Sequence, residues 1–191
     1  MFPDPTRSPA RYTRELSIRW VEAIRPEDAQ EGGLLWTFSR VVWLELDATS
    51  TPINNHTTSP FHAFSPSVKS LRVTGFTLVR PQVFHLILSL PLLENLCLDD
   101  YDSIEWYEPP IISSSTSPTL TGTLELTVCE GLETITPQLL DLPNGLHFRK
   151  QIFWCHYYDD LPWVEELMAA CSNTLKCLDV GHNLPSTILF W

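Results

Sequence analysis

The feature that most constrains the fold is a short apolar pattern that returns along the chain at near-constant spacing. It is clearest in "LPLLENLCLDD" (90–100), where Leu93, Leu96 and Leu98 form the pattern Leu-x-x-Leu-x-Leu. Six other stretches carry an equivalent of Leu96, and the aligned positions are 16, 44, 71, 96, 124, 151 and 178. Successive differences are 28, 27, 25, 28, 27 and 27 residues. One apolar strand is a weak signal, whereas seven at this period predict a repeating architecture.

The length of the period predicts what each repeat contains. A short strand, a turn, a helical or irregular return and a second turn use about 20–29 residues in leucine-rich repeats. We therefore expect an α/β fold, a leucine-rich-repeat-like solenoid of about seven irregular repeats. Its parallel β-sheet should line the concave side, with helices and loops on the convex side. Gln151 is the one polar residue at an aligned position, so the sixth register could be off by one.

Two of the return segments contain prolines that bound or interrupt a helix. Residues 80–91 predict a helix in which Pro81 suits the first turn and Pro91 ends it. Residues 131–143 predict a shorter helix that begins near Pro137.

The other long segments divide into one strong helix and two loops. Residues 159–173 predict a helix with one apolar face, and either Asp159 or Asp160 can cap its start. Residues 47–67 and 99–118 are rich in proline, serine and threonine and predict irregular loops.

Length and charge bound the domain count and the classes of partner. At 191 residues the chain predicts one domain, with a flexible N-terminal segment over 1–11 and the repeats over 12–191. A formal net charge of −11 argues against nucleic acid and against anionic membrane surfaces as partners. No apolar run approaches the roughly 20 residues that span a bilayer.

The cysteines and the N-terminus indicate a compartment. The five cysteines are odd in number and scattered, and the first residues, "MFPDPTRSPARYTREL", lack the apolar centre of an export signal. We therefore expect reduced thiols and a cytoplasmic or nuclear protein.

Several segments resemble a large family of basidiomycete fungal proteins that are F-box-associated and leucine-rich-repeat-like. The segments are "FHAFSPSVKSLRV", "LILSLPLLENLCL", "LTGTLEL" and "LPNGLHFRK". The resemblance covers Tyr12 to the C-terminus. It implies repeats that hold a substrate, while an N-terminal F-box recruits a cullin-type ubiquitin ligase in complete members. Only about a dozen residues precede the first repeat here, so we expect the F-box itself to be absent from this chain.

No group of residues predicts an enzyme. Cys155 and His156, with His147 nearby, could suggest a nucleophile and a base, but neighbouring residues of a strand point to opposite faces. We expect no catalytic residues, no cofactor and no metal ion. The leading hypothesis is a non-enzymatic protein–protein interaction module. The alternative is a truncated gene product or repeat fragment without independent function, and an enzyme is the least favoured.

If the chain binds a protein, the residues that flank the inward leucines are the candidates, because side chains alternate along a strand. The candidate partner-binding residues are Trp43, Glu45, Asp47, Arg72, Asp99, Glu125, Trp154 and Asp179. The two tryptophans would anchor the partner and the carboxylates would steer a basic one. The competing interpretation is a sheet face that is merely solvated.

The C-terminal sequence also predicts self-association. The chain stops at "TILFW", eleven residues beyond Val180, and no covering helix is predicted there. We therefore expect a poorly protected strand edge and association through uncapped ends.

Overall fold

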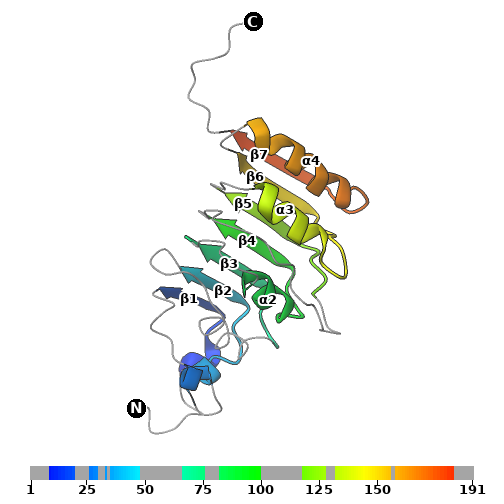
Figure 1. Cartoon of the computed structure of the whole chain (residues 1–191). Helices are drawn as coiled ribbons and strands as arrows, with labels where there is room; N and C mark the ends of the chain where they lie inside the picture. Colours follow the sequence, from blue (N-terminus) through cyan, green and yellow to red (C-terminus); the bar gives the residue numbers. More distant parts are fainter. Residues whose placement is uncertain are drawn as a thin grey trace, which may run out of the picture.

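The protein is an α/β fold built on one parallel β-sheet, which the computed structural model shows in Figure 1. The structure describes residues 9–19, 26–29, 33, 35–47, 66–75, 82–99, 118–127, 132–155 and 158–182. Within them, seven strands follow one another across the sheet in chain order, and every neighbouring pair is parallel. The strands are β1 (Glu15–Arg19), β2 (Trp43–Asp47), β3 (Ser70–Thr74), β4 (Asn95–Asp99), β5 (Thr123–Thr127), β6 (Lys150–Cys155) and β7 (Cys177–His182).

The aligned positions of the sequence pattern lie side by side in the sheet. Each is the second residue of its strand, and Leu71 pairs with Leu44 on one side and with Leu96 on the other. Leu71, Leu96 and Leu124 are buried neighbours in adjacent parallel strands, as expected if the aligned positions of the pattern face one core. Gln151 pairs with Leu124 and with Leu178, so the sixth register holds without a shift.

The three α-helices of the described residues lie on one face of the sheet (Figure 1). They are α2 (Gln82–Leu88), α3 (Leu132–Leu140) and α4 (Leu161–Ala170). Short 3-10 helices occur at η2 (Pro9–Tyr12), η4 (Pro26–Ala29), η5 (Leu35–Thr37) and η7 (Tyr158–Asp160). The helices predicted within 80–91 and 159–173 are therefore confirmed as α2 and α4.

The core lies between the helices and the sheet. The inward leucines of β2 to β5 are 0–1% exposed and join one cluster with the buried faces of the helices, among them Phe84, Leu139 and Leu167. In the inner strands the burial alternates strictly, with half-buried residues between the buried ones. The outward residues therefore form a second sheet surface on the side away from the helices.

Helix α3 starts earlier than the sequence predicted. It begins at Leu132, and Pro137 lies inside it. A proline inside a helix costs roughly 3 kcal/mol. The early start buries Leu132 and Ile135 together with Leu139 on one face, and full burial of such a side chain contributes about 1.5–3 kcal/mol. Apolar burial thus outweighs the local penalty.

The prediction that an aspartate side chain caps the start of α4 is wrong. Asp160 does occupy the N-cap position, but its side chain makes no capping hydrogen bond. Its backbone is already helical, at φ −76° and ψ −25°, because η7 runs directly into α4. Proline at position 162, in the first turn, also lacks the N–H that a cap would satisfy.

Parts of the chain lie outside the described residues. The two predicted loops fall mostly in 48–65 and 100–117, and residues 1–8 of the predicted N-terminal segment are also outside. Among the helices that the structure describes, none is long and apolar enough to cross a membrane.

Candidate functional site

The sheet surface away from the helices, called here the helix-free face, is made of the outward residues of the seven strands. It contains a shallow, open depression of about 330 Å³ over β2 to β6. The outward side chains that line it are Trp43, Ser70, Arg72, Asn95, Cys97, Thr123, Glu125, Lys150 and Ile152. The lining therefore mixes aromatic, charged and amide groups.

Arg72 links three strands at the depression. Its Nη2 donates to Oδ2 of Asp99 at 2.5 Å, and its Nε lies 3.9 Å from Oε1 of Glu45. The hydrogen bond to Asp99 raises the pKa of Arg72, and burial opposes this rise. Because Arg72 pairs with Cys97 in the register, Asp99 is its diagonal neighbour on β4. The Arg72 charge is thus already matched by two carboxylates.

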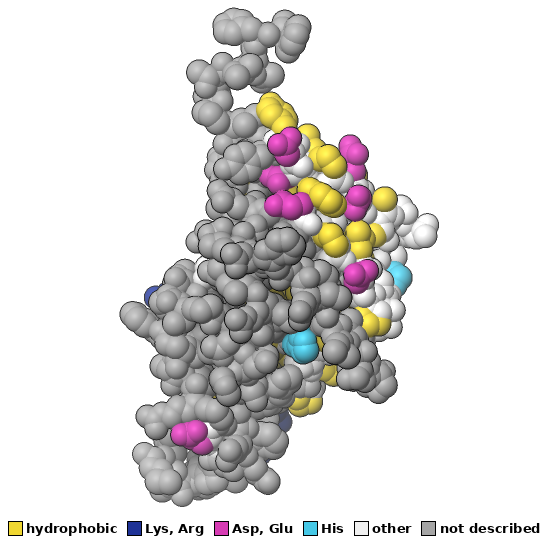
Figure 2. All heavy atoms as spheres, in the orientation of Figure 1, with side chains coloured by type: hydrophobic (Ala, Val, Ile, Leu, Met, Phe, Trp, Pro, Cys, Tyr) yellow, Lys and Arg dark blue, Asp and Glu magenta, His cyan; other side chains and the backbone are white. Residues whose placement is uncertain are grey.

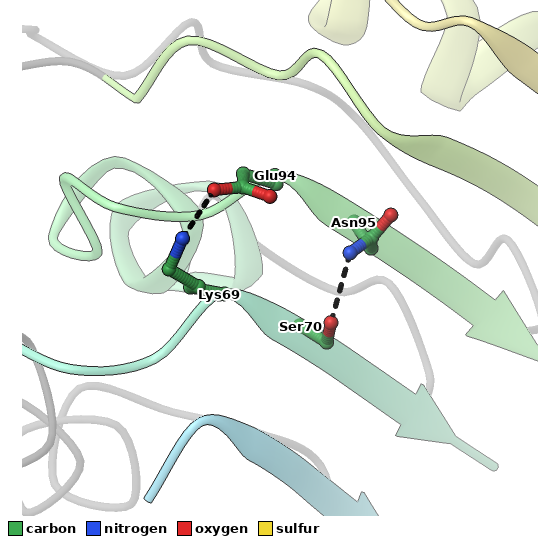
Figure 3. Close-up of polar contacts among 4 residues, drawn as sticks. All are labelled: Lys69, Ser70, Glu94 and Asn95. Carbon is green, nitrogen blue, oxygen red and sulfur yellow. Dashed lines mark hydrogen bonds and ion pairs between the residues drawn. The ribbon is translucent and has the colours of Figure 1, made fainter. Parts of the chain in front are cut away.

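A line of polar contacts joins the start of three strands. Nδ2 of Asn95 donates to Oγ of Ser70 at 2.9 Å, and the backbone N–H of Thr123 donates to Oδ1 of Asn95 at 2.8 Å. Just before the strands, Lys69 and Glu94 form an ion pair (Figure 3), in which Nζ lies 2.6 Å from Oε1. Both functional ends of the Asn95 amide are satisfied, so its orientation is fixed. This edge of the depression is preorganised.

The thiol in the depression is not a nucleophile at neutral pH. Burial, and then the negative charge of Glu125, raise the pKa of Cys97 to about 12. A thiolate is the reactive form of cysteine, and a group with this pKa stays protonated near pH 7. Cys97 therefore contributes a small apolar surface between Arg72 and Glu125.

The Cys155–histidine arrangement considered from the sequence gains no support among the described residues. Burial raises the pKa of the Cys155 thiol. Nε2 of His147 lies 3.0 Å from the carbonyl oxygen of Asn144. His156 lies outside the described residues.

Trp154 forms an exposed aromatic surface at the β6–β7 side of the face. Its side chain is 44% exposed, and its strand partner is Gly181. A methyl group on Gly181 would lie 2.6 Å from Cζ3 and 2.8 Å from Cδ2 of the indole. The ring therefore occupies the space that a side chain at position 181 would need, and glycine is required for this placement.

The structure brings some of the predicted binding residues together and leaves others apart. Trp43, Arg72 and Glu125 line the depression, and Glu45 and Asp99 reach it through Arg72. The remaining three lie outside its lining: Asp47, Trp154 and Asp179.

Sequence reasoning did not single out Lys150 and Ile152 as binding residues, although both line the depression. Alternation along the strand does place both residues on this face, since they precede and follow the aligned Gln151, but alternation alone does not show which outward residues bind. It could not reveal the link from Ser70 through Asn95 to Thr123, because that depends on side-chain rotamers.

Neither metal-ligand geometry nor similarity to known proteins assigns a role to this face. Among the described residues, no three His, Cys, Asp or Glu side chains gather closely enough to hold a metal ion. Comparison of the chain with protein-family models, curated proteins and solved structures gives no match.

Proposed function

We propose that this chain is a non-enzymatic protein–protein interaction module, folded as a leucine-rich-repeat-like solenoid, that holds a basic protein partner on its helix-free face. In this proposal it acts like the substrate-recognition arm of an F-box type ubiquitin ligase receptor.

The observation that carries the proposal is the composition of the helix-free face. Aromatic and ionisable side chains occupy the outward positions of the strands there, and an exposed Trp154 lies near Asp179 of β7. Buried aromatic anchors dominate the energetics of protein interfaces. An indole already fixed in place loses little conformational freedom on binding, which favours its use as an anchor.

The charges of this face favour a basic partner. Arg72 is matched by Asp99 and Glu45, as described above, whereas the described residues give Glu125 and Asp179 no salt bridge. A partner that brings lysine or arginine to these two carboxylates would be attracted at long range by the net charge of −11.

A photo-crosslinking experiment tests the proposal. A photoreactive benzoylphenylalanine at Ile152, in the lining of the depression, should capture a partner from an extract of cells that encode the chain. The same group at Glu165, which is exposed on α4, is the matched control on the other side of the sheet. Capture at Ile152 should fall when Trp154→Ala or Glu125→Lys is introduced.

The results also define failure of the proposal. Capture at position 165 but not at 152 would place the interface on the helices. Capture at 152 that is unchanged by both substitutions would show that Trp154 and Glu125 do not select the partner.

A further inference from the structure

Among the described residues, the row of inward apolar side chains is partly exposed where it ends at β7. Leu178 and Val180 are 40% and 41% exposed, whereas the aligned leucines of β2 to β5 are 0–1% exposed. The cause is position: among the described strands, β7 pairs only with β6. An exposed apolar strand edge with free backbone groups is a template for pairing with another strand.

The opposite edge of the sheet has a matching pattern. Among the described strands, β1 pairs only with β2. Its inward residues Leu16 and Ile18 are half-buried and pack against the core, while the outward residues between them are exposed. The two edges thus carry the same apolar alternation.

The charges of the two edges are opposite. Residues 9–19, which form η2 and β1, contain three arginines against one glutamate, and Arg11, Arg14 and Arg19 are all exposed. Residues 158–182, which form η7, α4 and β7, contain five carboxylates against one lysine. Figure 2 shows acidic side chains gathered among hydrophobic ones over the region of α4.

We propose that a second copy of this chain docks at the β7 edge through its own β1, so that the sheet continues from one molecule into the next. All strands of the sheet run parallel, so this pairing keeps the direction of the sheet. It keeps the register as well, placing Leu178 beside Leu16 and Val180 beside Ile18. The acidic end of one copy meets the basic edge of the next.

Charge disfavours the alternative in which β7 pairs with β7 of a second copy. That arrangement is two-fold symmetric and would bring two acidic ends together, at Glu165, Glu166 and Asp179 of both copies. Pairing of β7 with β1 is head-to-tail and leaves one free edge at each end. It therefore produces chains that grow beyond a dimer.

The test is the mass of the full chain in solution as its concentration rises. By sedimentation or light scattering, the average mass should rise from the 21.8 kDa of one chain past that of a dimer, and added salt should lower it. Val180→Lys should hold the chain at the monomer mass. Leu92→Lys is the matched control, because Leu92 is 48% exposed but lies before β4, away from both edges.

Mixing two variants, each blocked at a different edge strand, distinguishes β7–β1 pairing from β7–β7 pairing. Ile18→Lys blocks β1 and Val180→Lys blocks β7, so neither should assemble alone, but a mixture should form dimers that grow no further. Circular dichroism checks that each variant is folded. Because Ile18 is half-buried, Arg19→Glu, at an exposed position, serves as a second β1 variant that should weaken assembly.

Each contrary outcome overturns the proposal. These are a wild-type chain that stays monomeric at all concentrations, a Val180→Lys variant that still assembles, or β1 variants that assemble like the wild type. The last result would indicate β7–β7 pairing. The helix-free face stays open in this assembly, so capture at position 152 should survive Val180→Lys. The two proposals can therefore fail separately.

Discussion

At the scale of single residues, the aligned leucines are the positions at which the fold is most sensitive. Leu96 is 1% exposed and lies between Leu71 and Leu124 in the sheet. We expect Leu96→Ala to lower the free energy of unfolding by about 2–5 kcal/mol, because it leaves a cavity between β4 and the helices. Urea unfolding measures this loss. Leu92→Ala, at an exposed position, should change stability by less than about 0.5 kcal/mol.

Gln151 is the exception in the row of leucines, and its replacement should stabilise the protein. Its Nε2 donates to the carbonyl oxygen of Leu167 at 3.1 Å, but its buried Oε1 has no hydrogen-bond partner among the described residues. A buried polar atom without a partner costs about 1–3 kcal/mol. In Gln151→Leu the Leu167 carbonyl would still accept from the backbone N–H of Cys171 at 3.3 Å.

We therefore expect Gln151→Leu to raise the unfolding free energy by about 1 kcal/mol, measured by the same urea titration. The matched control is Gln151→Ala, which removes the amide but leaves a cavity and should destabilise. A Gln151→Leu variant less stable than the wild type would show that the link to α4 outweighs the unpaired oxygen.

We expect the Cys97 thiol to make the folded protein less stable at alkaline pH. Its pKa is raised from the ordinary value of 9.0 to about 12 in the folded protein. Below pH 9 the thiol is protonated in both states, so its contribution is fully present there. Between about pH 9 and 12 the unfolded chain loses the proton first, and the contribution is lost as pH rises.

At pH 10 the free energy of unfolding should fall by about 1.4 kcal/mol because of Cys97, since pH 10 is one unit above the ordinary thiol pKa of 9.0. Burial also raises the pKa of Cys155 and of Cys171, so these thiols act in the same direction. Unfolding measured at pH 8 and pH 10 gives the difference, which Cys97→Ala should reduce. Cys177→Ala, at an exposed thiol, is the control. An unchanged pH dependence in Cys97→Ala would contradict the prediction.

At the scale of elements, the strands were predictable and the ends of the helices were less so. The period located all seven described strands because each of the inner strands places one apolar pair, such as Leu96 and Leu98, against the same core. The residue at which a helix starts depends on competing local energies. At α3, apolar burial overrode Pro137, and at α4 the preceding 3-10 turn removed the expected role of Asp160.

The candidate site, too, was predictable only in part. Alternation placed the outward residues on one face, but it could not choose which charges pair. Arg72 meets Asp99 diagonally, and Trp154 leans over Gly181, because of side-chain directions that no spacing encodes. These two contacts decide which groups of the face are left for a partner.

The proline inside α3 gives a prediction for that element. Pro137 cannot donate a backbone hydrogen bond to the carbonyl of residue 133, one turn earlier. We expect Pro137→Ala to restore this bond and to stabilise the protein by about 1 kcal/mol, less than the roughly 3 kcal/mol of an isolated helix. The difference arises because proline also restricts the unfolded chain. Thermal unfolding measures the effect, and a lower Tm would indicate that the half-buried proline ring is needed for packing.

At the scale of the whole molecule, the net charge and the helix-free face together set how a partner would associate. The formal charge of −11 attracts a basic protein from a distance, and salt screens that attraction beyond about 8–10 Å. The charged groups and the aromatic group of the face should then affect different rate constants. Glu125 and Asp179 act before contact, whereas Trp154 acts only once its ring is covered.

For the partner captured at position 152, we therefore expect the association rate to fall as salt rises and to fall again in Glu125→Lys. Trp154→Ala should leave the association rate nearly unchanged and should speed dissociation, because the loss of an aromatic anchor often costs about 2 kcal/mol or more, some 30-fold in affinity. Gly181→Ala is the sharper variant, since it keeps the indole but displaces it from β7. Surface plasmon resonance at two salt concentrations measures all three variants. If Gly181→Ala dissociates like the wild type, the fixed position of the ring is not what holds the partner.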